Sequence, residues 1–568
     1  MPRFGALVAA FALLAAGFGL LVTPAAGLAD GPERVAGVAP VQLSNDTRSV
    51  TLTAVYPNPV PEGDAGEFVI LNVTAPTPLE NYTLTDGEAR VALPNRTVEG
   101  QIALTTAPNL TRDRTDARIL TLDQGLALAN GGDRVTLARG GDPVETIRYA
   151  DAPEGEVATP GREGIRWRPI GATDFPVVAA TGESTRAFVF PDGAAVPAET
   201  LAGADERILL AGYTLTSVRV RRALVAASRR GVRVRVLVDG SPVGGLTQRS
   251  ARTLDTLAER GVEVTVLSGD PARYAFHHAK YAVVDGRALV TTENWKPAGT
   301  GGHASRGWGV IVGSERIVTA LAATFRADAS GLDARAWRRY RVERRFEPAD
   351  GPPANGTFPK RVAPRRFDPE RIELLRAPDN AERRVRRLLR NADRTIRIEQ
   401  VSIGSRRQPF LRATLAAARR GVDVQILLSG AWYVEEENRE LVEWLNERAA
   451  REDLSLSARL ADPNGRFEKI HAKGVIVDDD QVLVGSLNWN NHSARANREV
   501  AILIAGEGVA GYFIGVFRAD WQGGDWRLPA GLVLAVVLAT LGALLVARRF
   551  EFGEGGVIEP GSVNRYSR

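Results

Sequence analysis

The chain has 568 residues, which is too long for one compact domain and predicts two or three. It contains no cysteine, which excludes disulfides, thiolate catalysis and cysteine-ligated zinc, and its five histidines are too scattered to predict a histidine metal cage. The formal net charge of +5 is small for this length and neither requires nor excludes an anionic partner.

The N-terminus predicts an export signal. Arg3 is followed by a long apolar run and then by small residues at Gly27 and Ala29. We therefore expect residues 1–29 to be a signal peptide.

Short alternating runs make up residues 41–150. They include SVTLTAVYPN, GEFVILNV, ARILTLD and DRVTLARG, separated by Gly, Pro, Asn and Asp, as is typical of a β-sandwich. The stretches YPNPVPEGDAGEFVIL and LANGGDRVTLARGGDPVETIRYAD resemble the lamin-tail domain. The resemblance implies an immunoglobulin-like sandwich, and any other small extracellular sandwich stays an alternative.

Strands alternate with helices after about residue 175. ERILLAGYTL precedes an arginine-rich helix that ends at Gly231, and RTIRIEQVSI precedes a similar helix that ends at Gly421. This internal duplication predicts two α/β halves, at 175–345 and 371–525, joined by a Pro-rich linker at 346–370.

An apolar segment close to the C-terminus predicts a membrane anchor. Residues 528–547 are long enough to span a bilayer as one helix. Arg548 and Arg549 follow at once, so the positive-inside rule places the tail, 548–568, in the cytoplasm. We expect a single-pass protein of the cell membrane whose remaining part is extracellular.

A polar motif occurs once in each half. HAKYAVVDG begins at His278, and HAKGVIVDDD begins at His471. If each copy enters a hairpin as a strand, the histidine and the lysine two positions later share one face. The DG pair at 285–286 predicts the turn, and equal spacing on the returning strand places Asn294 beside His278.

Each half therefore offers an imidazole, an ammonium and a carboxamide at one place. Lysine and asparagine can donate hydrogen bonds to the non-bridging oxygens of a phosphodiester, and a neutral imidazole nitrogen can attack phosphorus. The leaving alkoxide needs a proton, which the second histidine can supply. Two motifs in one chain make dimerisation unnecessary for the site.

These residues carry a resemblance to the phospholipase D superfamily, whose signature is a pair of H-x-K-x4-D motifs, each followed by G-S-x-N. The likeness covers roughly residues 175–525. The second copy is complete: His471, Lys473, Asp478, Gly485, Ser486 and Asn488. Glu499 lies where the family often has a glutamate that orients an imidazole.

The first copy departs from that pattern. Thr291 and Thr292 replace Gly-Ser, which either narrows the site or exchanges one hydroxyl for another. Trp308 stands where the glutamate is expected. Either another acid orients the first histidine, or the halves have specialised.

The resemblance implies a bilobal α/β fold whose motifs meet at the interface, no metal, no cofactor, and a reaction through a phosphohistidine. His278 would attack phosphorus, and His471 would protonate the leaving group and then activate water or an alcohol, although the two roles could be reversed. Phosphate would be bound by Lys280, Lys473, Asn294 and Asn488. Asp285 and Asp478 would stabilise the motif rather than react.

Three functions follow as hypotheses. The first is an exported, membrane-anchored phosphodiesterase that cleaves or transfers phospholipid head groups. The second is an extracellular nuclease of the same superfamily, so nucleic acid is a possible partner. The third is a non-catalytic lipid-binding or adhesion protein, which the irregular first motif favours slightly.

Overall fold

The computed structural model describes residues 49–59, 65–112, 114–115, 117–161, 164–170, 172–182, 184–269, 272–348, 351–523 and 538–543. The predicted signal peptide and cytoplasmic tail lie outside these residues, as does the predicted membrane span apart from 538–543. Within the described ranges, no helix is both long and apolar enough to cross a membrane.

The N-terminal region consists of two β-sheets. Its elements are β1 (Val50–Tyr56), β2 (Phe68–Pro78), β3 (Tyr82–Thr85), β4 (Arg90–Ala92), β5 (Thr97–Thr105), α2 (Pro108–Thr111), β6 (Arg118–Thr121), β7 (Gly132–Arg139), β8 (Asp142–Ala150), β9 (Glu156–Gly161) and β10 (Gly164–Pro169). One sheet has the order β10-β9-β1-β2-β5-β6 and the other β4-β3-β7-β8. Leu52 and Leu71 of the first sheet share a core with Leu84 and Leu137 of the second, so the region is a β-sandwich.

The first α/β half follows a short strand, β11 (Val178–Ala180). Its elements are β12 (Thr185–Phe190), α3 (Val196–Ala202), β13 (Arg207–Gly212), α4 (Val218–Arg229), β14 (Arg233–Asp239), α5 (Gln248–Glu259), β15 (Glu263–Leu267), β16 (Tyr281–Val284), β17 (Arg287–Thr291), β18 (Ser305–Val312), α6 (Glu315–Ala329), β19 (Ala334–Ala336) and α7 (Trp337–Glu343). Strands β13, β14 and β15 are parallel, whereas β16, β17 and β18 are antiparallel.

The second half repeats this plan after β20 (Arg365–Phe367). Its elements are β21 (Arg371–Ala377), α8 (Ala381–Arg390), β22 (Thr395–Gln400), α9 (Pro409–Ala418), β23 (Asp423–Leu428), α10 (Glu435–Glu452), β24 (Leu456–Leu460), β25 (Lys469–Ile470), β26 (Lys473–Val477), β27 (Gln481–Gly485), α11 (Asn491–Arg495), β28 (Glu499–Ala505) and α12 (Glu507–Gln522). The helices predicted in both halves end as expected, because Gly231 (φ 93°) and Gly421 (φ 94°) adopt the left-handed conformation.

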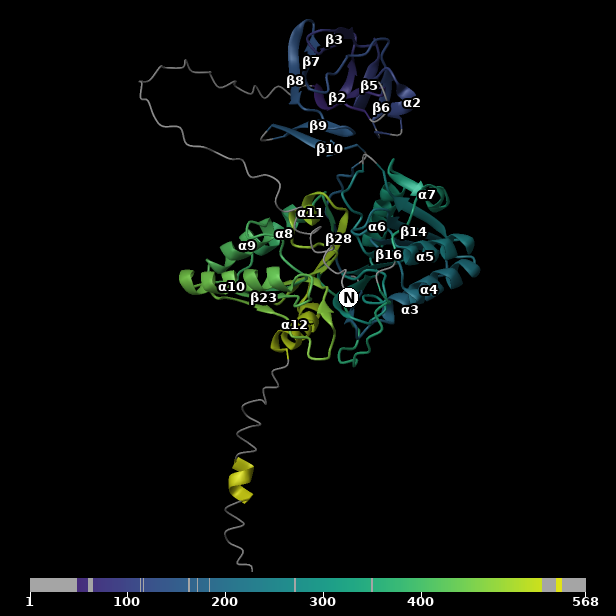
Figure 1. Ribbon diagram of the computed structural model, residues 1–568. Helices are drawn as coiled ribbons and strands as arrows, with labels where there is room; N and C mark the ends of the chain where they lie inside the picture. Colours follow the sequence, from purple (N-terminus) through teal and green to yellow (C-terminus); the bar gives the residue numbers. More distant parts are fainter. Residues whose placement is uncertain are drawn as a thin grey trace, which may run out of the picture. The chain divides into compact units, whose positions relative to one another are not determined.

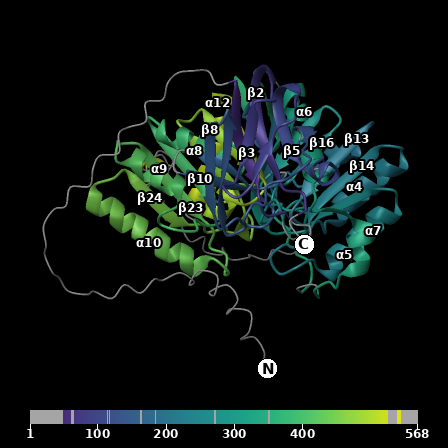
Figure 2. The ribbon, with the colours of Figure 1, turned by 90° about the horizontal axis from the view of Figure 1, so that it is seen from above.

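The two halves interlock. Strand β11 pairs with β21 of the second half, and β25 pairs in parallel with β18 of the first. In Figures 1 and 2, helices α4 and α5 and helices α9 and α10 lie on opposite outer sides, with the sheets between them. Residues of both halves fill one core between the sheets, where Trp308 stacks on Phe513 with ring centroids 4.6 Å apart. This core fixes the relative position of the two hairpins that carry the motifs.

Candidate active site

Both motifs form the predicted hairpins, but the histidines lie just before the strands. Val284 pairs with Arg287 across one turn, and Val477 pairs with Gln481 across the other. His278 and His471 instead bind the opposite half: the His278 N–H donates to the Arg498 carbonyl (3.0 Å), and the His471 N–H donates to the Arg306 carbonyl (2.8 Å). The backbone therefore holds each histidine at the seam between the halves.

The motif aspartates anchor the hairpin turns, away from the histidines. Asp285 accepts hydrogen bonds from the backbone N–H groups of Asp205, Glu206 and Arg207 at 2.8 to 3.0 Å. These bonds hold the pKa of Asp285 below its usual value, although burial alone would raise it. Asp478 accepts three equivalent bonds from residues 393–395. These hydrogen bonds attach the first turn to the start of β13 and the second turn to the start of β22.

Glu499, in the second half, contacts the histidine of the first. Its carboxylate oxygens lie 2.9 and 3.0 Å from His278 Nδ1. Ser493 Oγ donates to the same carboxylate at 2.8 Å. Burial alone would raise the pKa of Glu499, but the charges of His278 and Lys280 and the hydrogen bonds of His278 and Ser486 lower it, so the carboxylate is charged. It orients His278 so that Nε2 is left for other partners.

His471 has a carboxylate partner that the motif analysis did not include. Glu293, in the first half, places Oε2 3.3 Å from His471 Nδ1. Glu293 is buried, and burial raises its pKa to about 8, although Lys473 and Lys280 act in the opposite direction. Both histidines thus have a carboxyl group from the opposite half beside Nδ1, and His471 Nδ1 also lies 3.4 Å from Lys473 Nζ.

The counterpart of Glu499 in the first half is Gly307, not Trp308 as the motif pattern predicted. Ser486 N–H donates to the Val500 carbonyl (2.9 Å), and Thr292 N–H donates to the Trp308 carbonyl (2.9 Å), which makes Trp308 equivalent to Val500. A Cβ added at Gly307 would overlap the carboxylate of Glu293. Glu293 therefore fills the space that a side chain at position 307 would occupy.

Thr292 keeps the backbone hydrogen bond that the motif serine accepts, and Thr291 donates to the carbonyl of Trp308 (3.2 Å) as Ser486 donates to the carbonyl of Val500 (3.3 Å). The Thr292 hydroxyl accepts from the Trp308 N–H (3.0 Å), as the Ser486 hydroxyl accepts from the Val500 N–H (3.0 Å). Thr291 is accommodated because its strand partner is Gly309. The sequence allowed two interpretations of the threonines, a narrower site or the exchange of one hydroxyl for another. These contacts support the exchange.

Lys280 and Lys473 each affect the pKa of both histidines. Burial, together with Lys280 and Lys473, lowers the pKa of His278 to about 4 against the attraction of Glu499. Burial also lowers the pKa of His471, again with contributions from Lys473 and Lys280. Each lysine thus acts on the histidine of the other half. The pKa of Lys473 itself falls to about 8 through burial, which Glu293 and Glu499 oppose.

The motif asparagines are less closely tied to the histidines. Asn294 and Asn488 are half-buried, and Asn294 Oδ1 is a buried atom without a hydrogen-bond partner. In the described ranges no hydrogen bond joins Asn294 to His278, so their direct contact stays a prediction.

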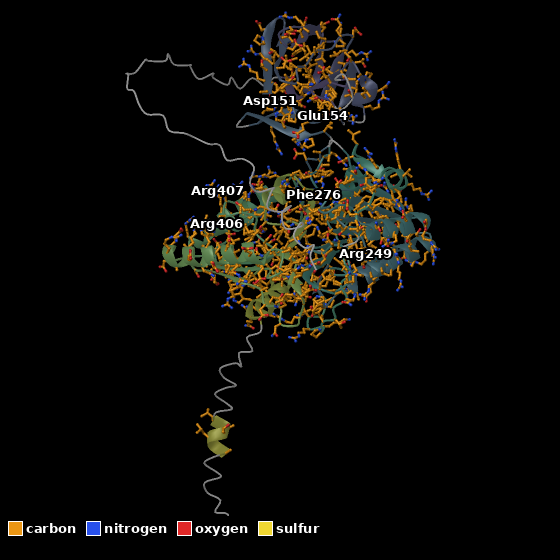
Figure 3. All side chains as sticks on the ribbon, in the orientation of Figure 1. Asp151, Glu154, Arg249, Phe276, Arg406 and Arg407 are labelled. Atoms are coloured by element: carbon orange, nitrogen blue, oxygen red, sulfur yellow. The ribbon has the colours of Figure 1, made fainter. Side chains whose placement is uncertain are left out.

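Tyr213 is a second site residue that the motifs did not reveal. Its ring packs edge-on against the His278 ring, with centroids 4.9 Å apart, and Lys280 Nζ lies 5.5 Å from its centroid. Figure 3 labels Phe276, two residues before His278, where the teal first half meets the green second half. Glu293 could have been found from the sequence, because it directly precedes the motif residue Asn294. The sequence around Tyr213, in contrast, does not distinguish it from a core residue.

Comparison with known families agrees with this geometry. The model described as cardiolipin synthase, PLD-like domain, matches residues 198–329 and 385–521, which include both motifs. The chain belongs to the phospholipase D superfamily. Members of this superfamily are phosphodiesterases and phospholipid-modifying enzymes. A search of curated proteins finds no match.

Several solved structures are similar to this chain. Phosphatidylserine synthase from Haemophilus influenzae Rd KW20 is 12% identical over 63% of this chain and 94% of its own, with a TM-score of 0.42. The phospholipase D family member Nuc from Salmonella typhimurium is 21% identical over 27% of this chain and 97% of its own, with a TM-score of 0.24. Polyphosphate kinase from Porphyromonas gingivalis is 12% identical over 63% of this chain and 55% of its own, with a TM-score of 0.41.

Proposed function

We propose that the protein is an exported, membrane-anchored, metal-independent phosphodiesterase that cleaves or transfers phospholipid head groups. The observation that carries this proposal is the crossed arrangement in which Glu499 holds His278 and Glu293 holds His471. Two imidazoles held through Nδ1 leave both Nε2 atoms for one phosphorus between them. The lamin-tail identity of the sandwich and the extracellular location are parts of the same proposal.

In the first step, Nε2 of neutral His278 attacks phosphorus, and the bond to the leaving oxygen breaks. The low pKa of His278 keeps the imidazole neutral, and Glu499 stabilises the positive charge that develops on it. Lys280 and Lys473 offset the charge of the non-bridging oxygens. Protonated His471 gives its proton to the leaving alkoxide, because the bound phosphodiester raises the imidazole pKa that burial lowers.

In the second step, neutral His471 takes the proton from water or from an alcohol. The oxygen attacks phosphorus, the P–N bond breaks, and the electron pair returns to His278. Water gives hydrolysis and an alcohol gives head-group transfer.

Exposed apolar side chains beside the site support a lipid substrate. Val243 is 62% exposed, and its N–H donates to Tyr213 Oη (2.5 Å), whose ring contacts His278. Trp432 is 86% exposed and packs on Tyr433, whose ring lies 5.2 Å from Lys469 Nζ, two residues before His471. Val243 and Tyr433 stand at equivalent places in the repeat, each three residues after the glycine that follows a strand. We call Val243, Trp432 and Tyr433 the apolar rim.

The contacts of the first motif weigh against a non-catalytic role. The absence of Gly-Ser and of the downstream glutamate favoured that reading. Thr292, however, accepts the same backbone hydrogen bond as the serine, and Glu293 places a carboxyl group beside His471. A binding protein has no need for a relocated acid at this position.

A substrate panel tests the proposal. Full-length protein with EDTA is incubated with vesicles of phosphatidylcholine, with vesicles of phosphatidylglycerol and with single-stranded DNA. We expect release of choline or glycerol, and we expect no nucleotides. Nucleotide release alone would favour the nuclease, and no cleavage of any substrate would favour the binding protein.

A further inference from the structure

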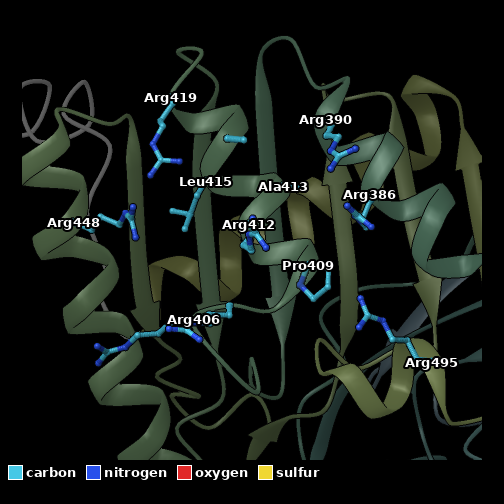
Figure 4. A pocket seen from close by; sticks show the side chains of 12 residues that line it. Arg386, Arg390, Arg406, Pro409, Arg412, Ala413, Leu415, Arg419, Arg448 and Arg495 are labelled. Atoms are coloured by element: carbon cyan, nitrogen blue, oxygen red, sulfur yellow. The ribbon is translucent and has the colours of Figure 1, made fainter. Parts of the chain in front are cut away.

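A hollow of about 610 Å³ on the helical side of the second half is lined by eight arginines and by no acidic residue. Figure 4 shows it between α8, α9 and α10. Helix α8 contributes Arg386 and Arg390, and helix α9 contributes Arg412 and Arg419. This charge lies outside the catalytic motifs and has no role in the proposed reaction.

The other four arginines come from three further segments. Arg406 and Arg407 lie in the loop before α9, Arg448 belongs to α10, and Arg495 ends α11. Figure 3 labels Arg406 and Arg407 on the green second half. Arg406 and Arg448 each lie 5.1 Å from the ring centroid of Trp444, so two guanidinium groups are held in place by one indole.

Two glutamates neutralise only part of this charge. Glu382 pairs with Arg386 (3.4 Å) and Arg495 (2.6 Å). Glu452 pairs with the other two arginines that have carboxylate partners, Arg419 (2.9 Å) and Arg448 (2.8 Å). Eight guanidinium groups against two carboxylates leave a net charge of +6 around one hollow. The like charges repel one another, and a bound anion would relieve that repulsion.

Arg390 and Arg412 have exposed side chains on opposite helices of the hollow, and within the described ranges neither makes a side-chain ion pair or hydrogen bond. Guanidinium groups in this state can bind phosphate oxygens bidentately. Arg406 and Arg407 also have no ion pair in the described ranges. Four such groups around one space match an anion with more than one phosphate better than a single phosphate.

The fold itself does not require this cluster. Helices α3 and α4 of the first half correspond to α8 and α9 of the second, but α3 has the sequence VPAETLA and no arginine. The arginines of α8 are therefore specific to the second half. Helix α4, by contrast, has four arginines against one in α9, so only the α8 part of the cluster is specific to the second half.

We propose that this arginine hollow binds a compact anion carrying two or more phosphate groups, either free in solution or presented by anionic lipid head groups. The proposal does not depend on the proposed function. It assigns a second phosphate site, separate from the catalytic histidines.

The test compares Arg390→Ser/Arg412→Ser with a matched control, Arg229→Ser/Arg252→Ser, which removes two exposed arginines from α4 and α5 of the first half. The two variants and the unsubstituted protein, all full-length and in neutral detergent, are titrated with inorganic tripolyphosphate and with neutral micelles that carry phosphatidylglycerol. Inorganic phosphate and a single-stranded oligonucleotide serve as further probes. We expect the hollow variant to bind at least one probe at least tenfold more weakly than the control does, because each of the two lost charge-assisted bonds contributes about a factor of ten. Inorganic phosphate should bind weakly to all three proteins.

The two probes separate the sources of the ligand. A loss confined to tripolyphosphate indicates a free polyphosphate anion, and a loss confined to the micelles indicates lipid head groups. Equal binding by the hollow variant and the control would overturn the proposal. A loss seen only with a single-stranded oligonucleotide would also overturn it, in favour of a nucleic-acid groove.

Discussion

At the residue scale, the carboxyl groups that contact the two histidines differ in protonation state. Glu499 is held charged by His278, Lys280 and its hydrogen bonds, whereas burial raises the pKa of Glu293 to about 8. A charged partner stabilises the imidazolium that forms when His278 attacks phosphorus. A partner that is neutral at pH 7 stabilises the cation of His471 less, which suits a group that must release its proton. The carboxylate partners therefore agree with His278 as nucleophile and His471 as acid.

Glu293 should act as a positioning residue for His471. We expect Glu293→Ala to lower kcat by roughly 10²-fold, because an acid–base catalyst without its orienting partner loses much of its contribution. In Glu293→Ala, space becomes free at Gly307, where an added side chain would otherwise overlap the Glu293 carboxylate. The double variant Glu293→Ala/Gly307→Glu should recover part of kcat, as measured by steady-state kinetics.

Thermal unfolding of both variants serves as the control for this pair. If the double variant is stably folded and shows no recovery over Glu293→Ala, a carboxylate near His471 is not what the reaction needs. Gly307→Glu alone should be harmful, because two acids would compete for one space.

The pH profile of kcat/KM should reflect buried groups. The pKa of His278 is lowered to about 4, so its imidazole stays neutral and nucleophilic until the pH falls to about that value. The pKa of Lys473 is lowered to about 8, so phosphate binding should weaken as the pH rises through 8. A pH profile whose acidic limb lies near pH 6.5 and whose basic limb lies above pH 10 would contradict this account, because these are the pKa values of exposed histidine and lysine. The double variant Lys280→Arg/Lys473→Arg should move the basic limb upward, because burial also lowers the pKa of Lys280.

At the scale of the elements, the hairpin turns depend on their aspartates. Asp285 has φ 50° and caps three backbone N–H groups of the segment before β13. We expect Asp285→Asn to lower the free energy of unfolding by about 1 kcal/mol, since an amide tolerates this backbone but forms weaker hydrogen bonds. Chemical denaturation measures the change, and activity per folded molecule should be nearly kept.

Asp453→Asn is the matched control for the turn. Asp453 also has a left-handed backbone, with φ 51°, but it is exposed and ends α10 without such contacts. Equal destabilisation of both variants would show that the backbone conformation, not the three hydrogen bonds, stabilises the hairpin.

The hairpins, the repeated strand–helix–strand units and most strands of the sandwich follow from local patterns in the sequence. Strands β3 and β5 escaped prediction, because the short run YTLT and the interruption at Gly100 hide their alternation. Strands β9 and β10 also escaped prediction, because they lie beyond residue 150, where the predicted sandwich ended. The crossing of the acids also escaped prediction. It depends on the backbone pairing of His278 with Arg498 and of His471 with Arg306, which are contacts between distant parts of the chain. Motif spacing reports neighbours in sequence, so it identified both histidines but assigned the position of the missing acid to Trp308.

At the scale of the whole molecule, the apolar rim should direct the site to a lipid surface. We expect Trp432→Ser to lower the rate on phospholipid vesicles by about tenfold, because inserting a large side chain into lipid contributes about 1.5–3 kcal/mol. The rate on a soluble, short-chain phosphodiester should stay unchanged. Val243→Ser should have a smaller effect in the same direction.

Val342→Ser is the control for the rim, because Val342 is as exposed as Trp432, at 86%, but lies on α7, a helix that carries none of the site residues. Equal losses for Trp432→Ser on both substrates would mean that the side chain supports the fold and not the approach to a membrane.

The account as a whole depends on two halves that act on one phosphorus atom. Acid-quenched enzyme, mixed with substrate and mapped by mass spectrometry, tests this most directly. We expect phosphate on His278, no phosphate in His278→Ala, and accumulated phosphate on His278 in His471→Ala, where water can no longer be activated. Label on His471 in the absence of His278, or no label on either histidine during turnover, would contradict the account.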